Sequence, residues 1–426
     1  MHKEAMELNE IIKKESPLIY GLLSETGKKT YFSKTGIFAQ SLQAKQTELN
    51  ATIGIALEED GSIMHLKSIT KYILLEPQDI FPYVPMPGKP ELRKLWQQSI
   101  YEKNPSLKSL ISTPVVTNAL THGVSVTAQL FIDPEDIILL SDKSWSNYNV
   151  IFSTQEPIFK SYKTFSEGGL DIDALEDAFG QNIGKKILLL NYPNNPTGYS
   201  PTNKEVQRIL EIIKKRADMG DRILAVCDDA YFGLTYEDNV YKESLFAPLS
   251  NIHENILAIK IDGATKENFA WGLRVGFLTF GYKGMTKSVC KALEEKIVGT
   301  VARNISNVSN LSQSLVLKSL NSPDYSQEKQ EKQEILKLRY NAIKEVLKNP
   351  KFNEYFNALP FNSGYFMCLE LNKNIDIEKV RKKLLLDYDT GVVTTSGCIR
   401  IAFSSVNLKN IPLLFENIYT ACKNIV

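Results

Sequence analysis

Three short segments of the sequence place reactive side chains directly after apolar runs. They are residues 191–198 (NYPNNPTG), 228–231 (DDAY) and 262–266 (DGATK), and Arg274 follows the last of them by eight residues. Together they offer a carboxylate, an amide, a phenol, an amine and a guanidinium. If these groups meet in one crevice, they suit an anionic, aromatic, nitrogen-containing cofactor that carries an aldehyde.

Short apolar runs that end in polar residues predict the strands that would position these groups. The runs are 136–140, 187–190, 223–226, 256–261 and 275–280. Runs of four to six apolar residues are typical of strands that are buried on both faces. Helical patterns separate most of the runs, and this alternation predicts a largely parallel sheet covered by helices. In such sheets, ligands bind outside the carboxyl ends of the strands.

The pattern changes after about residue 320, which predicts a second structural unit. Residues 326–348 are typical of a long charged helix with an apolar stripe, and three shorter pieces follow at 364–371, 375–385 and 398–403. We therefore expect an α/β fold with a large, mostly parallel-sheet domain over 75–320. A smaller α+β domain would combine 321–426 with 1–74, which also supplies an N-terminal arm.

Composition excludes several classes of protein. The 426 residues are 43% hydrophobic and 23% charged, as in ordinary globular proteins, and the net charge of +1 gives no broad field to attract nucleic acid or anionic lipid. The five cysteines are scattered and never in C-x-x-C spacing, which argues against a disulfide framework and a zinc site. Without a signal peptide pattern or an apolar run of about 18 residues, we expect a cytoplasmic protein with no metal, membrane or nucleic-acid partner.

Four motifs, taken in order, carry a family resemblance. They are N-N-P-T-G at 194–198, D-D-A-Y at 228–231, T-K-x7-R at 265–274 and C-I-R-I-A at 398–402. Each is weak alone, but their order and intervals are highly specific. From about residue 50 to about residue 405, the chain resembles the class I/II aminotransferases of the aspartate and aromatic type. The resemblance implies the fold of the type I pyridoxal-phosphate (PLP) enzymes, PLP as cofactor, and ping-pong transfer of an amino group between an L-α-amino acid and a 2-oxo acid.

For the reacting end of the cofactor, the resemblance implies four residues. Lys266 is similar to the lysine that joins the PLP aldehyde as a Schiff base and then moves the proton at the substrate Cα. Asp228 matches the carboxylate that keeps the pyridine nitrogen protonated, so that the ring accepts electrons. Tyr231 and Asn195 match the donors to the ring 3′-oxygen. Lys266, Asp228 and Tyr231 are the expected catalytic residues.

The resemblance also implies residues around the cofactor phosphate and ring face. Arg274 matches the guanidinium that grips the phosphate in a fork. Thr121 and the backbone amides of Leu120 and Thr121 lie where the phosphate would meet a helix N-terminus. Thr265 adjoins the cofactor lysine, and Trp145 matches the ring that stacks on the cofactor.

Further matches concern the substrate and the partner subunit. Arg400 matches the arginine that binds the substrate α-carboxylate, with Gly54 and Asn195 beside it. Tyr148 falls where the family keeps a residue that supports the pyridine carboxylate. Tyr83 matches a tyrosine that crosses to the phosphate of the partner subunit. The resemblance therefore implies a homodimer with shared active sites.

The sequence departs from the family pattern at two places near the phosphate. Gly263 stands where the family has a serine, and residues 118–120 (NAL) replace a glycine-rich turn. We expect fewer protein groups to bind the cofactor phosphate, or the Thr265 hydroxyl to replace the missing serine hydroxyl. We also expect a cis peptide at Asn195–Pro196, because the turn must aim the amide and a cis X-Pro bond costs only about 0.5–1 kcal/mol.

Each of these residues also has an ordinary structural interpretation. Taken alone, Lys266 would be a surface lysine and Arg400 an edge-strand arginine. Asp228 would be a turn residue, Trp145 a core aromatic and Thr121 a helix cap. The order and spacing of the motifs favour the functional interpretation over these.

Two alternative functions remain open. A PLP-dependent lyase could use the same scaffold for β-elimination, because a fold does not fix its chemistry. A PLP-sensing regulator without enzymatic activity would need a DNA-binding module, and the first 50 residues are too short and too neutral to supply one.

The substrate preference depends on one offset in the sequence. Dicarboxylate-specific relatives place an arginine four residues before the serine of an S-N pair. Here the pair is Ser306–Asn307, the fourth residue before Ser306 is Ala302, and the arginine is Arg303. One residue turns a helical side chain by about 100°, so we expect neutral or aromatic amino donors, with 2-oxoglutarate as acceptor.

Overall fold

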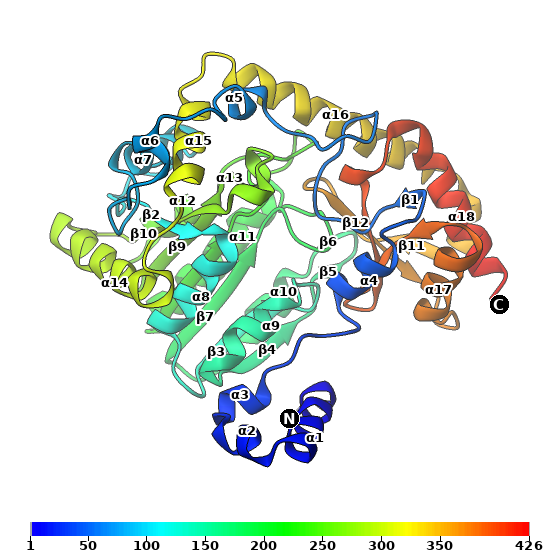
Figure 1. Cartoon of the computed structure of the whole chain (residues 1–426), viewed down its shortest axis with the longest axis horizontal. Coiled ribbons are helices and arrows are strands. Elements are labelled where there is room, and N and C mark those ends of the chain that lie inside the picture. The colour runs from blue at the N-terminus through cyan, green and yellow to red at the C-terminus, as the bar shows by residue number, and fades with distance from the viewer. Residues whose placement is uncertain (1, 426) are drawn as a thin grey trace.

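A seven-stranded mixed sheet forms the centre of the structure, a computed structural model that describes residues 2–425 (Figure 1). Its strand order is β2-β10-β9-β8-β7-β3-β4. The strands are β2 (Val115–Asn118), β3 (Ile137–Ser141), β4 (Ile158–Tyr162), β7 (Lys185–Asn191), β8 (Arg222–Asp228), β9 (Ile256–Gly263) and β10 (Val275–Gly281). From β9 to β4 all neighbours are parallel, whereas β10 is antiparallel to both β9 and β2. The expected largely parallel sheet is confirmed.

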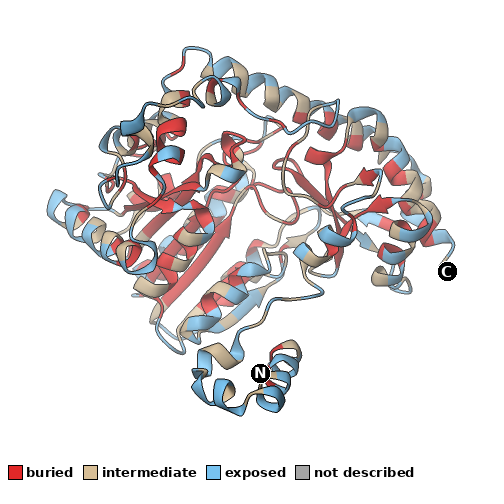
Figure 2. Ribbon diagram, viewed as in Figure 1, coloured by how far each residue is buried: buried red, intermediate tan, exposed pale blue. Residues whose placement is uncertain are grey.

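The central strands form because their side chains are apolar on both faces. Successive residues of β8 face different cores: Val226 belongs to one hydrophobic cluster, and Ala225 and Cys227 belong to the other. Figure 2 shows these strands as the most buried part of the molecule. Strands β2 and β4 were not predicted. The edge strand β4 is exposed or half-buried along its whole length, so it has no continuous apolar run to reveal it.

Helices cover both faces of this sheet. Side chains of three helices pack into the cluster that contains Val226, namely α8 (Ala119–Phe131), α9 (Asn147–Phe152) and α14 (Lys287–Ile305). Helices on the opposite face are α7 (Pro90–Lys103), α10 (Ile172–Phe179), α11 (Asn203–Asp218), α12 (Phe246–Ile252) and α15 (Asn310–Leu320). Helix α11 starts at a capping box formed by Thr202 and Glu205.

A four-stranded antiparallel sheet lies beside the first one, at the right of Figure 1. Its order is β11-β12-β15-β14, with β11 (Phe356–Ala358), β12 (Phe366–Leu371), β14 (Val393–Thr395) and β15 (Cys398–Ala402). Its helices are α16 (Tyr325–Val346), α17 (Ile377–Asp387) and α18 (Ile411–Lys423). We call the two sheets the large sheet and the small sheet.

The remaining elements are short. The N-terminal helices are α1 (Lys3–Glu15), α2 (Pro17–Leu22), α3 (Glu25–Lys29) and α4 (Ile37–Gln43), followed by α5 (Lys67–Thr70) and α6 (Pro77–Ile80). Two small strand pairs join β1 (Leu49–Asn50) to β13 (Thr390–Gly391) and β5 (Phe165–Ser166) to β6 (Gly169–Leu170). Within residues 2–425, no helix combines the length and the apolar character that a membrane span needs.

A tight main-chain contact joins the two sheets at Gly198. Its carbonyl accepts hydrogen bonds from the backbone N–H groups of Asn362 (2.9 Å) and Ser363 (2.8 Å), just before β12. Gly198 has φ = +70°, and a Cβ there would lie 1.8 Å from the carbonyl oxygen of Phe366. Only glycine fits this approach. The turn after β7 is therefore locked against the small sheet.

This contact predicts a large cost for Gly198→Ala. Gly61→Ala is the matched control, because Gly61 also has a positive φ (+84°) but has no atom within 4 Å of the added Cβ. Both variants should lose about 1 kcal/mol to the left-handed backbone. We expect Gly198→Ala to lose about 3 kcal/mol more, because the backbone of Phe366 must move. Urea unfolding measures both, and equal stability of the two variants would show that the approach is not restrictive.

Candidate active site

The carboxyl ends of β7, β8 and β9 bring the three sequence segments together. Parallel pairing places Asn191 opposite Asp228, and the Asn191 side chain donates to the Asp228 carbonyl oxygen at 2.9 Å. The side-chain oxygen of Asn191 also accepts from the backbone N–H of Asn195 at 2.8 Å. Asn191 thereby fixes the start of the N-N-P-T-G turn relative to the D-D-A-Y segment.

Asp228 is the buried carboxylate of the site, with 3% of its surface exposed. Its Oδ2 accepts a 2.5 Å hydrogen bond from the Tyr148 hydroxyl, and its Oδ1 accepts from the backbone N–H of Ala230. Burial raises the pKa of Asp228, while the Tyr148 hydrogen bond and the charge of Lys266 act to lower it. Trp145 packs edge-on against Tyr148, with ring centroids 5.2 Å apart.

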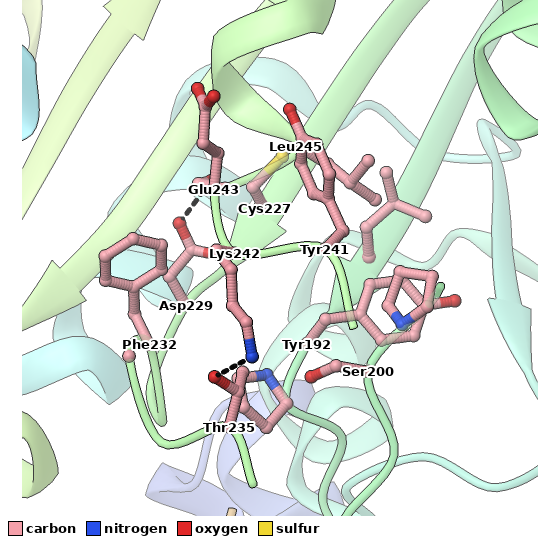
Figure 3. A pocket seen from close by; sticks show the side chains of 15 residues that line it. Tyr192, Ser200, Cys227, Asp229, Phe232, Thr235, Tyr241, Lys242, Glu243 and Leu245 are labelled. Atoms are coloured by element: carbon pink, nitrogen blue, oxygen red, sulfur yellow. Dashed lines mark hydrogen bonds between the residues drawn. The ribbon is translucent and has the colours of Figure 1, made fainter. Parts of the chain in front are cut away.

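The neighbouring Asp229 points to the opposite face of the sheet. There it pairs with the Lys260 amine and accepts from the Ser244 hydroxyl at 2.6 Å. Lys260 is 1% exposed and also lies 3.5 Å from a carboxylate oxygen of Asp262. Figure 3 shows Asp229 among the side chains that line a cavity on this rear face, together with Cys227. Of the two adjacent aspartates, only Asp228 faces Tyr148 and Lys266.

Lys266 lies in a single helical turn, α13 (Ala264–Glu267), at the end of β9. Its Nζ is 5.2 Å from the centroid of the Tyr231 ring. Burial lowers the pKa of Lys266 to about 8, with help from Arg274 and against the opposing charge of Asp228. A pKa near 8 leaves part of the amine neutral, and therefore nucleophilic, close to neutral pH.

A buried ion cluster anchors this turn from the side. Glu267, next to the lysine, is 2% exposed and binds both the Lys103 amine and the Lys329 amine, the latter at 2.6 Å. The two lysines hold the pKa of Glu267 at about 2, although burial opposes them. The turn that carries Lys266 is thus tied to α7 and to α16.

Gly263 has a steric reason to replace a serine. A Cβ at Gly263 would lie 2.6 Å from the carbonyl oxygen of Val275 and 3.3 Å from the Leu120 side chain. The adjacent strand β10 therefore excludes any side chain at this position. Close by, the Thr265 hydroxyl is buried and has no hydrogen-bond partner, as an oxygen that awaits a ligand would.

The turn before Thr121 keeps a glycine-like conformation without a glycine. Ala119 has φ = +61°, and its N–H donates to the Arg274 carbonyl oxygen at 3.0 Å. Helix α8 begins at Ala119, so Thr121 lies in its first turn with an exposed side chain. Leu120 is buried beside it.

Arg400 lies on β15 of the small sheet and reaches the large-sheet turn. Its Nη1 donates to the Asn195 side-chain oxygen (3.2 Å) and its Nη2 to the Thr52 carbonyl (2.9 Å). Its Nε is buried without a partner, and the guanidinium carbon is 4.3 Å from the Phe366 ring centroid. A Cβ on Gly54 would lie 3.4 Å from Phe366, so this glycine allows the chain to approach closely.

Hydrogen bonds and ring contacts thus gather several of the expected residues at the carboxyl ends of β7, β8 and β9, but Tyr83 is not among them. The Tyr83 side chain is 89% exposed, and the Asn307 amide holds its segment by donating to the Val84 carbonyl at 3.0 Å. Arg303 is also exposed, in the last turn of α14. Within one chain, no described contact links either residue to Lys266.

The expected cis peptide at Asn195–Pro196 is confirmed. The structure also contains features that the sequence did not reveal, the first of which is a second cis peptide at Tyr192–Pro193. The Tyr365 hydroxyl donates to the Lys266 carbonyl, and the Cys368 thiol donates to the Pro196 carbonyl. These last contacts cross between the two sheets, and no local sequence signal marks them.

The family model for class I and II aminotransferases matches residues 50–418. The chain belongs to this family. Its similarity to individual members is low. It is 25% identical to the mitochondrial aspartate aminotransferase of Schizosaccharomyces pombe, over 80% of this chain and 77% of that protein. It is also 25% identical to a probable N-acetyl-LL-diaminopimelate aminotransferase of Bacillus subtilis, over 60% of this chain and 59% of that protein.

Solved structures of aminotransferases share the whole fold. An aminotransferase of Anaerococcus prevotii superposes with a TM-score of 0.83 at 21% identity, covering 94% of this chain and 99% of that one. The cytoplasmic aspartate aminotransferase of Saccharomyces cerevisiae gives a TM-score of 0.77 at 18% identity, covering 96% and 100%. The expected fold of the type I PLP enzymes is confirmed for this aminotransferase family member.

The different environments of the two aspartates predict losses of stability of different size. Asp229→Ala leaves the buried Lys260 with only the more distant Asp262, so we expect a loss of about 3 kcal/mol in unfolding free energy. Asp228→Ala should cost less, because no ion pair among residues 2–425 involves Asp228. Urea unfolding of the two proteins tests this. A larger loss for Asp228→Ala would contradict the assignment of faces.

Proposed function

We propose that the chain is a PLP-dependent aminotransferase that moves an amino group between an L-α-amino acid and a 2-oxo acid. The observation that carries the proposal is the placement of Lys266. Its amine lies over the Tyr231 ring and interacts with the charge of the buried Asp228 carboxylate, and burial lowers its pKa to about 8. Membership of the aminotransferase family supports the same activity.

The residues present fit PLP. The donor set contains an amine for the aldehyde, a carboxylate for the ring nitrogen and a phenol for the ring oxygen, in Lys266, Asp228 and Tyr231. The unpartnered buried hydroxyl of Thr265 adds a donor without a present acceptor, as a phosphate site requires. When bound, PLP supplies an aldehyde and a ring that accepts electrons from the substrate Cα.

The other groups that would hold PLP lie around this set. Arg274 would bind the phosphate together with Thr121 and the backbone amide of Leu120 at the start of α8. Asn195 would donate to the ring oxygen beside Tyr231. Trp145, which packs against Tyr148, would cover the ring face. Because Gly263 has no room for a side chain, the unpartnered Thr265 hydroxyl would contact the phosphate in its place.

The reaction assigns distinct tasks to three side chains. Lys266 would hold the PLP aldehyde and would act as the base that moves the proton of the substrate Cα, and the neutral fraction of its amine grows as pH rises through about 8. Asp228 would keep a proton on the ring nitrogen of PLP, and the hydrogen bond from the Tyr148 hydroxyl favours the ionised carboxylate. Arg400 binds the substrate α-carboxylate through its Nη groups and its unpartnered Nε.

Transamination and the role of Asp228 can be tested together. The purified protein with PLP should convert L-phenylalanine and 2-oxoglutarate to phenylpyruvate and glutamate in equal amounts. Asp228→Ala should lower kcat/KM about 10³-fold, because it removes a preorganised charge from the reacting ring. Asp229→Ala, assayed where it is folded, should stay within about tenfold of the parent.

Product analysis separates this reaction from its main rival. Release of ammonia and an oxo acid without any amino acceptor would identify a lyase instead. Full activity in Asp228→Ala together with its loss in Asp229→Ala would contradict the site.

We further propose that the preferred donors are neutral or aromatic. Helix α14 continues to Ile305, so Ala302 and Arg303 differ by one helical step, about 100°. Arg303 therefore does not take the place of the distal-carboxylate arginine. Tyr365 and Phe366 pack on Tyr231, and Trp271 packs on Tyr365, so the surroundings of Tyr231 are aromatic.

The donor preference is tested by measuring kcat/KM for L-phenylalanine and for L-aspartate, with 2-oxoglutarate as acceptor. We expect phenylalanine to lead by about tenfold or more, since apolar contacts discriminate by about 1–3 kcal/mol. Arg303→Ala should leave the ratio unchanged. An aspartate preference that Arg303→Ala abolishes would assign Arg303 to the distal carboxylate.

We also propose a homodimer in which Tyr83 completes the partner's site. One segment carries four large exposed residues, and a contiguous exposed apolar surface commonly marks an interface; the residues are Ile73, Leu74, Phe81 and Tyr83.

The free buried thiols are in accord with a cytoplasmic location. The positions of the two sheets support domains of 75–320 and of 1–74 with 321–426.

Subunit mixing tests the shared site. Tyr83→Ala and Lys266→Ala should each be strongly impaired. If each site takes its lysine from one chain and its tyrosine from the other, hybrid dimers contain one intact site. An equal mixture should then recover about a quarter of the parent activity. No recovery, with hybrid dimers demonstrated by differential tagging, would contradict the shared site.

A further inference from the structure

The main chain of Lys266 receives a hydrogen bond from the small sheet. The Tyr365 hydroxyl donates to the Lys266 carbonyl oxygen at 3.1 Å. Tyr365 is fully buried immediately before β12, whereas Lys266 lies in α13 at the end of a large-sheet strand. The hydrogen bond therefore joins the two sheets at the residue on which the proposed chemistry depends.

The turn that carries Lys266 is short. It comprises only four residues, and the Lys266 carbonyl also accepts from the backbone N–H groups of Asn268 and, at 3.2 Å, Phe269. Glu267 fixes one side of the turn through Lys103 and Lys329. The carbonyl of Lys266 is held separately, by the hydroxyl of Tyr365. A short turn held from two sides keeps its side chain in one orientation.

Strand β12, which follows Tyr365, pairs with β15, and β15 carries Arg400, the proposed carboxylate-binding residue. Strands β12 and β15 pair so that Phe366 lies opposite Ala402 and Cys368 lies opposite Arg400. Arg400, which would hold the substrate carboxylate, is thus connected to the main chain of Lys266. The connection runs through the antiparallel pair of β15 and β12 and then through the Tyr365 hydroxyl.

We propose that Tyr365 is a positioning residue that sets the orientation of Lys266 relative to Arg400 through this hydrogen bond. The inference rests on the proposed function of Lys266 and extends it to a residue that does not touch the reacting atoms. The hydroxyl is the part that matters. The ring of Tyr365 also packs on Tyr231 (centroids 5.2 Å apart) and Trp271 (6.4 Å), and phenylalanine would keep those contacts.

Tyr365→Phe tests the proposal, with Tyr236→Phe as the matched control. Tyr236 is also buried in the aromatic cluster, and its hydroxyl also donates to a carbonyl, that of Gly364, at 2.6 Å. Each variant loses one buried hydroxyl bound to the main chain, so both should lose thermal stability by similar amounts. Only Tyr365→Phe removes a contact of Lys266.

Three measurements on the PLP-loaded enzymes separate positioning from packing. For Tyr365→Phe we expect kcat to fall roughly tenfold with KM changed less than about twofold, because a displaced base slows proton transfer more than it weakens binding. The pH midpoint of the visible cofactor band should shift by about half a unit or more. Hydrogen exchange should speed up in a peptide that covers 264–268. Tyr236→Phe should show none of these three changes.

Two results would overturn the proposal in distinguishable ways. If Tyr365→Phe matches the parent in kcat, band midpoint and exchange while Lys266→Ala lacks the band, Lys266 holds the cofactor but Tyr365 does not position it. The proposal also fails if Tyr236→Phe reproduces the changes. If the band persists in Lys266→Ala, the proposed function of Lys266 fails, and the role of Tyr365 fails with it.

Discussion

The proposed chemistry requires an ionised Asp228, although the folded chain buries this side chain almost completely. Burial raises the pKa of a carboxyl group, and in this pocket the Tyr148 hydroxyl, the Ala230 N–H and the charge of Lys266 act against that rise. The three groups come from different elements, so Asp228 is stabilised only when β8, α9 and α13 meet correctly. Correct packing of these three elements is therefore required both for the fold and for the proposed chemistry.

The alternation of side chains along β8 separates two kinds of buried charge. Asp229 and Lys260 neutralise each other on the rear face, whereas Asp228 on the front face is stabilised by hydrogen bonds and is left available for a ligand. A shift of one residue in the strand would exchange these environments. The Gly198 contact then brings the small sheet, with Arg400, against the front face.

Much of this arrangement follows from sequence, and the limits have physical causes. Apolar runs predicted β3, β7, β8, β9 and β10, because strands buried on both faces need continuous apolar residues. Motif order indicated Lys266 and Asp228. The steric reason for Gly263, the hydroxyl contact of Tyr365 and the half-exposed strand β4 depend on distant backbone or on an edge position. None of these leaves a periodic signal along the chain.

The central claim is that Lys266 is the residue that holds the cofactor, and covalent trapping measures this directly. The protein is loaded with PLP, reduced with borohydride, digested and mapped by mass spectrometry. The account predicts a phosphopyridoxyl group on Lys266, in a peptide that contains Asp262 and Gly263, and its absence from the Lys266→Ala protein. Stoichiometric modification of another lysine, such as Lys260 or Lys143, with Lys266 unmodified, would contradict the account.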